Sequence, residues 1–170
     1  MEIILAAALL PAIILMVYVY KHDKIEKEPF VLLLTLFAFG ALSCVPAGIL
    51  EDLFSEVLDS MNIQDNQTYY IIMCFGIVAC SEEGAKLFFL KSKTWRCPDF
   101  NYTFDGLLSS VCVSLGFAGL ENIMYVMDYG FGVVISRGLL SVPGHCTFAI
   151  FMGLFYSRAK FHSTYGNKTR

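Results

Sequence analysis

The sequence predicts an all-α membrane protein, a polytopic bundle of about five transmembrane helices. Of the 170 residues, 56% are hydrophobic and only 16% are charged, and the mean hydropathy is +0.61. A water-soluble surface needs a higher density of charge than this. Apolar stretches also recur along the chain, each close to the roughly 20 residues that cross a ~30 Å hydrocarbon core. We therefore expect a single integral-membrane domain over residues 1–170.

The apolar stretches define the predicted helices in order. The first covers residues 3–20; it has Glu2 where a signal peptide has a basic flank, and no small-residue cleavage site, so we interpret it as a mature span. The second covers residues 30–49. In the following loop, residues 51–68, apolar side chains at helical spacing lie opposite acidic ones, which predicts a short amphipathic helix on the outer surface. The other spans are expected at 69–90, 106–127 and 131–156.

The positive charges indicate an orientation. Lysine and arginine occur in the loops 21–28 and 91–104 and in the tail after residue 156, whereas the loops 51–68 and 128–130 have none. The positive-inside rule then predicts an N-terminus outside and a C-terminus inside, in a multi-pass protein. No disulfide framework is expected, because five of the six cysteines lie in predicted spans. Lipid is the expected surrounding, and no nucleic-acid partner is expected.

Ionisable residues within the spans are the most informative, because each must face a partner or a water-filled cavity. The first two spans have none. In the third span a lysine follows two glutamates by three and four positions, so it can pair with either carboxylate and leave the other in surplus. The polar residues are Glu82, Glu83 and Lys86 in the third span, Glu121 and Asn122 in the fourth, and Arg137 and His145 in the fifth.

Small residues line one face of each of the last two spans. Counting back from Glu121 by helical steps gives Ala118, Ser114 and Ser110. The fifth span has, at successive i+4 steps, Arg137, Ser141, His145, Ala149 and Gly153. Such stripes let helices approach closely. Pro143 lacks a backbone donor, so it predicts an irregular turn next to the histidine. Along the axis the glutamates and the histidine spread over roughly 10 Å, which a helix tilt of ~20° can close.

Three carboxylates, an imidazole and two cations in a low-dielectric bundle fit three kinds of chemistry. Glutamate and histidine ligands can hold a divalent metal that activates water. Without a metal, a glutamate can act as general base, assisted by His145. The same groups can relay protons or ions in a transporter. We favour hydrolysis, because the chain lacks the matching pair of broken helices typical of secondary transporters. A non-catalytic membrane scaffold is a further alternative.

Four segments resemble motifs of the PrsW family of intramembrane proteases. They are HDKIEKEPF at residues 22–30, SEEGAK at 81–86, FDGLLSSVCVSLGFAGLENIMYV at 104–126 and RGLLSVPGHCTFAIFMG at 137–153. Their order and spacing agree with the family over most of the chain. The resemblance implies a multi-pass peptidase of the bacterial cell membrane, distantly related to the CAAX-prenyl endopeptidase and bacteriocin-processing superfamily. It also implies a membrane-anchored protein substrate, such as the anti-sigma factor that begins a signalling cascade.

The same resemblance implies which residues act. Active-site roles fall to Glu82, Glu83, Glu121 and His145, with Lys86, Asn122 and Arg137 in support. Relatives often have a histidine where this chain has Glu121, and Asn or Asp where it has Ala149. A divalent metal such as zinc would be bound through Glu83, Glu121 and His145, whereas a glutamate-activated water needs no metal. Both mechanisms stay open, and the spacing does not decide which glutamate is the base.

Overall fold

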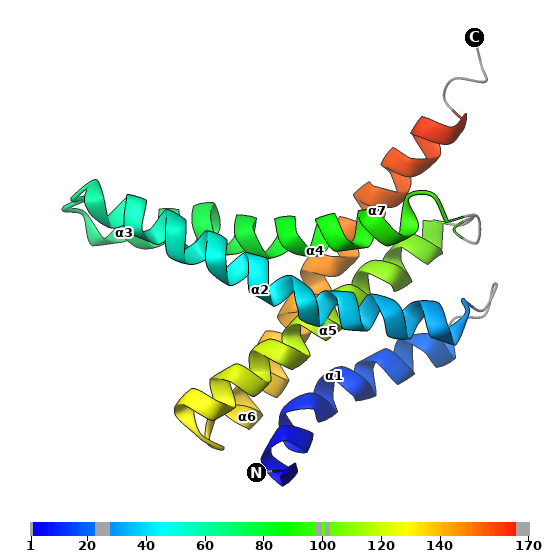
Figure 1. Ribbon diagram of the computed structural model, residues 1–170, viewed down its shortest axis with the longest axis horizontal. Coiled ribbons are helices and arrows are strands. Elements are labelled where there is room, and N and C mark those ends of the chain that lie inside the picture. The colour runs from blue at the N-terminus through cyan, green and yellow to red at the C-terminus, as the bar shows by residue number, and fades with distance from the viewer. Residues whose placement is uncertain (1, 23–27, 98–99, 101–102, 166–170) are drawn as a thin grey trace.

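The computed structural model describes residues 2–22, 28–97, 100 and 103–165, and within them every regular element is a helix (Figure 1). Two of the helices contain a π-helical stretch, η1 and η2. The elements are α1 (Glu2–His22), α2 (Phe30–Ser60), α3 (Asn66–Ile71), η1 (Ile72–Val78), α4 (Ala79–Thr94), α5 (Thr103–Tyr129), α6 (Val133–Ser136), η2 (Arg137–Ser141) and α7 (Val142–Tyr165). Since α3–η1–α4 and α6–η2–α7 each run on without a break, the predicted all-α arrangement of five helices is confirmed.

The second helix is longer than predicted. α2 continues through Ser60, so the separate amphipathic helix expected in the loop after residue 50 is wrong. Residues 49–60 contain neither glycine nor proline, and nothing in them stops a helix. The chain turns instead at Asn62, whose φ of 49° is left-handed, and α3 then begins after Asp65, whose carboxylate accepts hydrogen bonds from the first turn. The amphipathic pattern of these residues does form a helix, but as the continuation of α2.

Three helices are long and apolar enough to cross a membrane: Phe30–Ser60, Thr103–Tyr129 and Val133–Ser163. Leu5–Lys21 is a shorter apolar helix. The α3–η1–α4 helix contains the charged motif predicted for the third span, which lowers its hydropathy. A helical membrane bundle is therefore supported, while the count of five crossings and the orientation stay predictions. Lys24, Lys27, Lys168 and Arg170, which contribute to that orientation, lie outside the described residues.

α5 is the centre of the bundle. α1, α2, α4 and α7 all pack against it, and it is buried almost continuously between Asp105 and Gly119. Glycines bring α2 and α5 close together. A Cβ on Gly40 would overlap the backbone of α5 at Val113, and a Cβ on Gly116 would overlap the backbone of α2. This contact brings the two backbones nearer than larger side chains would allow.

Two serines attach α7 to α5. Ser114 Oγ donates a hydrogen bond to the carbonyl oxygen of His145 at 2.9 Å, and Ser110 Oγ donates to that of Ala149 at 2.7 Å. On the same line, a Cβ on Gly153 would meet the Ser110 hydroxyl. The two predicted stripes of small residues therefore face each other. Their contacts hold His145 at a fixed height along α5.

α4 and α7 are joined at the end where Thr94 and Tyr156 lie. Thr94 Oγ1 lies 2.7 Å from Tyr156 Oη. Lys160 Nζ donates to the carbonyl oxygens of Thr94 at 2.8 Å and Cys97 at 3.1 Å. The last carbonyls of a helix have no intrahelical partners, so the buried ammonium caps the C-terminus of α4. Towards α3 and α6 the two helices diverge (Figure 1).

Candidate active site

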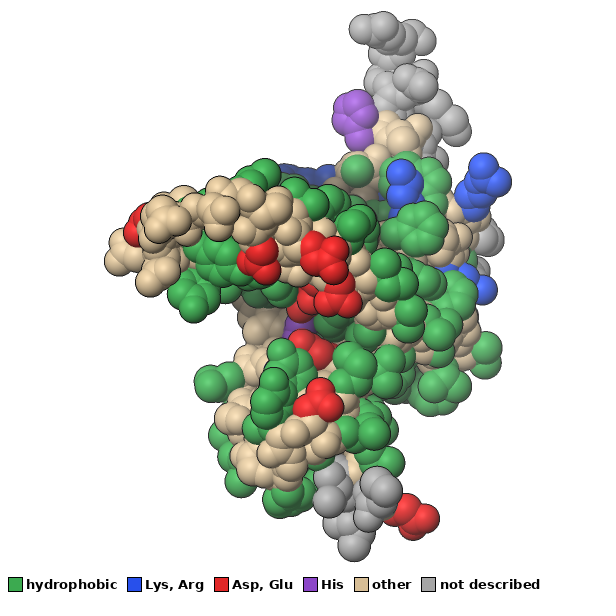
Figure 2. Space-filling view, turned by 60° about the vertical axis from the view of Figure 1, so that its left-hand side comes forward, with side chains coloured by type: hydrophobic (Ala, Val, Ile, Leu, Met, Phe, Trp, Pro, Cys, Tyr) green, Lys and Arg blue, Asp and Glu red, His purple; other side chains and the backbone are tan. Residues whose placement is uncertain are grey.

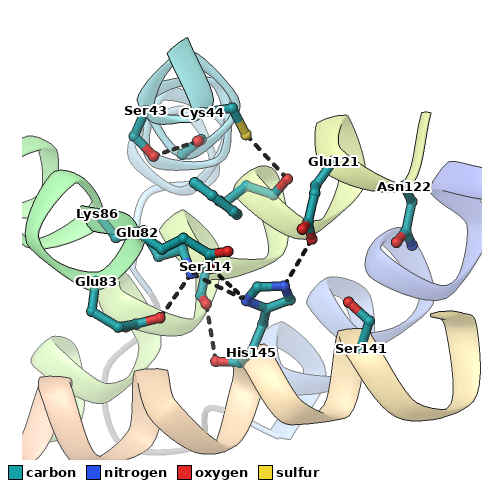
Figure 3. A network of polar contacts seen from close by, with 12 residues as sticks. Ser43, Cys44, Glu82, Glu83, Lys86, Ser114, Glu121, Asn122, Ser141 and His145 are labelled. Atoms are coloured by element: carbon teal, nitrogen blue, oxygen red, sulfur yellow. Dashed lines mark hydrogen bonds and ion pairs between the residues drawn. The ribbon is translucent and has the colours of Figure 1, made fainter. Parts of the chain in front are cut away.

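Lys86 lies at the centre of the residues that the sequence nominated (Figure 3). Its side chain is fully buried, and its ammonium contacts Glu82 Oε2 at 3.0 Å, Glu83 Oε1 at 2.7 Å and His145 Nδ1 at 3.1 Å. An ammonium has three N–H donors and no acceptor, so these bonds use every donor. The sequence predicts a pair with either glutamate, and in the structure the lysine pairs with both at once. Because α7 crosses α4 here, His145 becomes the third partner of Lys86.

His145 links two groups of charges. Because Lys86 can only donate, Nδ1 of the imidazole accepts, and the partners assign the ring proton to Nε2. Nε2 lies 3.0 Å from Glu121 Oε2 and donates to it. The imidazole is therefore neutral and fixed at both nitrogens. These contacts also close the axial spread that the sequence positions implied.

On the far side of the histidine, Glu121 forms a short ion pair with the guanidinium of Arg137. Arg137 is itself held in place: its Nε donates to Asn122 Oδ1 at 2.8 Å and its terminal nitrogen to Ser141 Oγ at 3.1 Å. The Asn122 amide reaches the carbonyl oxygen of Ala8 in α1 at 3.4 Å. The residues predicted to support the site thus connect it to α1, α5 and η2.

The charges of the site do not cancel. Three carboxylates (Glu82, Glu83 and Glu121) face two cations (Lys86 and Arg137), and the neutral histidine adds nothing, so one negative charge is in surplus. Glu121 has its own arginine, whereas the other two carboxylates share one ammonium. Glu83 Oε2 is buried and accepts no hydrogen bond from the described residues. The surplus negative charge therefore lies on Glu82 and Glu83, the glutamates of the SEEGAK motif.

A cavity of about 340 Å³ borders these groups. Acidic side chains gather round a histidine in a hollow between two arms of the molecule (Figure 2). One wall comes from η1 and α4 and the other from η2 and α7. The lining residues are Cys74, Phe75, Val78, Ala79, Glu82, Glu83, Ser141, Gly144, His145 and Phe148. The site is accordingly open to a ligand on the side of Glu83, where most of the wall is apolar.

A metal can be tested against the donor atoms present. Glu82, Glu83 and His145 each offer one ligand atom, and these atoms lie within 4.8 Å of one another. This group differs from the predicted set of Glu83, Glu121 and His145, because Glu121 contacts the opposite ring nitrogen. The ammonium of Lys86 already binds all three donors. While it holds that place, the group does not fit a divalent cation, since two positive charges would meet in a buried site.

Phe117 belongs to the site and was not predicted. The Lys86 ammonium lies 4.0 Å from the centre of its ring, and the ring of His145 packs at 5.6 Å. Phe117 precedes Glu121 by one helical step of four, so this position was readable from the sequence. An aromatic residue in an apolar span is usually read as core packing. Here its face stabilises a buried cation.

The comparisons with known proteins identify the family of the chain. Residues 28–170 match the family described as PrsW family intramembrane metalloprotease. Protease PrsW of Oceanobacillus iheyensis is 32% identical over 165 residues, which cover 97% of this chain and 73% of that protein. The protein of the same name from Geobacillus kaustophilus is 31% identical over 169 residues, covering 93% and 67%. That of Bacillus subtilis is 30% identical over 158 residues, covering 93% and 69%. No solved structure matches the chain. The chain therefore belongs to the PrsW family of intramembrane proteases.

Proposed function

We propose that this intramembrane protease hydrolyses a peptide bond of a membrane-anchored protein with a water molecule activated by Glu83. Membership of the PrsW family supports the peptidase activity. One observation supports the choice of base. Glu83 lines the cavity; its Oε1 is held by Lys86 at 2.7 Å, while its buried Oε2 accepts no hydrogen bond from the described residues. A carboxylate with one oxygen anchored and the other unoccupied is oriented to take a proton.

The proposed reaction follows from these positions. Water attacks the carbonyl carbon of the substrate and gives its proton to Glu83 Oε2 as the C–O bond forms. The carbonyl oxygen becomes an oxyanion. When the C–N bond breaks, the proton passes from Glu83 to the leaving amine, so the carboxylate is restored for the next cycle. Each proton and electron pair is accounted for by substrate, water and one glutamate.

The remaining residues position the base and stabilise charge. Lys86 holds Glu83, and Glu121 holds His145 through Nε2–H. Lys86 places a positive charge beside Glu83, and a low-dielectric surrounding strengthens its effect. His145 lies between Lys86 and Glu121 and fixes the distance between them. In this proposal Glu82, Glu121 and His145 are positioning residues for Glu83.

The family description includes a metal, and a divalent ion such as zinc was one of the alternatives that the sequence left open. The occupation of Glu82, Glu83 and His145 by Lys86 favours the metal-free course, so no step is assigned to a metal. For the substrate, the resemblance supports a membrane-anchored regulatory protein of the anti-sigma-factor kind. Family membership favours hydrolysis over the transporter and scaffold alternatives.

The test compares cleavage by wild-type protein with that by Glu83→Gln and His145→Ala in vesicles containing a co-reconstituted single-span substrate. Glu83→Gln should lower the rate by about 10²–10⁴-fold, the usual contribution of a general base. Glu56→Gln is the matched control, because Glu56 is exposed near the end of α2. Thermal unfolding in detergent should show that all variants fold. Undiminished cleavage by both site variants would refute the proposal.

A further inference from the structure

We infer that the seam between η1–α4 and η2–α7 binds the membrane-spanning segment of the substrate, with an apolar side chain next to the cleaved bond in the cavity beside Glu83. This inference rests on the proposed function and specifies its substrate. It concerns the apolar residues of the two cavity walls, which have no role in the hydrolytic step.

The seam is a groove because cavities lie between its two helices. α5 packs against both α4 and α7, and α4 meets α7 through Lys86 and His145 and again at Thr94, Tyr156 and Lys160. A second cavity of about 330 Å³ lies along the same seam, between Leu87 and Trp95 of one helix and Met152 and Phe155 of the other. Two cavities in line, with Glu83 at one of them, form a track alongside the active site.

The first cavity is reached from the hydrocarbon. Phe75 on one wall and Phe148 on the other are 70% and 57% exposed, and both line the cavity. Val78 and Ala79 continue the apolar wall down to Glu82 and Glu83. Against Phe75, Val78 and Phe148 a charged side chain would lose its hydration, which only Glu82 or Glu83 could replace for a cation, whereas an apolar side chain loses nothing. The occupant is therefore apolar, and it arrives from the lipid.

Both walls are built from widened helical turns. At the end of η1 the N–H of Ala79 donates to the carbonyl oxygen of Cys74, five positions back. In η2 the N–H of Val142 donates to the carbonyl oxygen of Arg137, also five back. Pro143, next in the chain, has no N–H to restore the ordinary spacing. A π-helical turn holds an extra residue and is wider than an α-helical one. The wider turns flank the cavity on its two sides.

The groups beside the cavity identify its occupant. Glu82, Glu83 and His145 line the same space as the apolar wall, so whatever fills it lies against the proposed base. A lipid chain would block that base, whereas a substrate segment brings its peptide bond to it. The apolar wall then selects the residue beside that bond. Specificity for large apolar residues is expected.

The first experiment measures binding without catalysis and uses two native cysteines. Cys74 lines the cavity, whereas Cys80, exposed on the same helix, does not. A synthetic single-span peptide of about 20 leucines and alanines, with a haloacetyl group at its centre, is added to Glu83→Gln protein in phosphatidylcholine vesicles. Cross-linking should favour Cys74 several-fold, and Val78→Phe should suppress it while Ile71→Phe does not. If both thiols are labelled equally, or if Val78→Phe has no effect, the peptide reaches the cysteines from the lipid without binding in the cavity. Either result would overturn the inference.

The second experiment measures cleavage of peptides that carry alanine, leucine or phenylalanine beside the cleaved bond. Val78→Phe should lower cleavage of the phenylalanine peptide relative to the alanine peptide by about tenfold or more, since small changes in an apolar pocket have effects of this size. Ile71→Phe should leave the ratio unchanged. If wild-type protein cleaves and Val78→Phe keeps its preference, the inference fails and the proposed function stands. If Cys74 is labelled selectively but wild-type protein cleaves no peptide, the inference stands and the proposed function fails.

Discussion

The ammonium of Lys86 lies 3.1 Å from Nδ1 of His145, although the two residues are 59 positions apart and on different helices. This contact assigns the ring proton to Nε2, because a lysine can only donate. It also leaves neither ring nitrogen available to bind a metal or to accept a proton from water. The histidine therefore acts by holding other groups in place.

Chelators should not inhibit the wild-type protein. Lys86 binds Glu82, Glu83 and His145, the donors that a metal would need. Lys86→Met frees these donors and should allow zinc to bind, whereas Lys91→Met, an exposed lysine on α4, should not. Plasma mass spectrometry of purified proteins measures bound metal, and vesicle cleavage with and without chelator measures dependence. One zinc per wild-type chain, with activity lost on chelation, would contradict the metal-free site.

Arg137 and Glu121 should contribute to stability as a unit. Arg137→Gln takes the cation away from a largely buried carboxylate, which costs about 3–5 kcal/mol of unfolding free energy in comparable buried pairs. Glu121→Gln should destabilise as well. The double variant should lose less unfolding free energy than the two single variants together, by about 0.5–3 kcal/mol, because neighbouring sites are coupled. Denaturation in micelles measures all three, with the exposed Arg158→Gln as control. Strict additivity would show that the pair does not interact.

Two glycines of α2 should respond oppositely to alanine. At Gly40 a Cβ overlaps the backbone of α5, so Gly40→Ala should force the helices apart and cost about 1–3 kcal/mol. At Gly48 a Cβ meets nothing within 4 Å, so Gly48→Ala should stabilise the helix by up to about 1 kcal/mol. Thermal unfolding in one detergent compares the pair. A similar response at both positions would argue against the close contact of α2 with α5.

Asp65 should make the start of α3 sensitive to acid. The Thr68 hydroxyl, and then the Thr68 N–H, donate to its carboxylate and hold the pKa of Asp65 below its ordinary value of 3.8. A lowered pKa means that the cap stabilises the helix above pH 3.8 and that this contribution is lost as the pH falls through the folded-state pKa. Amide exchange at Gln67 and Thr68 should therefore quicken in that range. Asp65→Asn, which caps without titrating, should not show this change beyond the intrinsic pH dependence of exchange.

The local parts of the site could be predicted from the sequence. Helical spacing predicts that Lys86 can pair with either glutamate, and the structure pairs it with both. It also predicts close approach of a helix along Ser110 and Ser114, and in the structure that helix is α7. Such relations depend on positions three or four apart on one helix, or on small residues that allow close packing. Pro143 likewise indicated an irregular turn before His145, and η2 is that turn.

The relations between helices could not be predicted in the same way. Which nitrogen of His145 faces Lys86, and which faces Glu121, depends on how α4, α5 and α7 cross. No spacing within one helix contains that information. For this reason the predicted metal set included Glu121, whereas the structure groups Glu82 with Glu83 and His145. The extent of α2 was missed differently, because an amphipathic pattern looks the same in a new helix and in a continued one.

The buried ammonium of Lys86 has a consequence for inhibitor chemistry. Hydroxamates and other chelating groups inhibit metalloproteases by binding the metal, and here they would meet a saturated lysine instead. A compound suited to this site would carry an uncharged hydrogen-bond donor for Glu83 Oε2 and an apolar arm for the space between Phe75 and Phe148. It would need to partition into lipid to arrive there. Its affinity would come from shape and desolvation, and its selectivity from the width of that space.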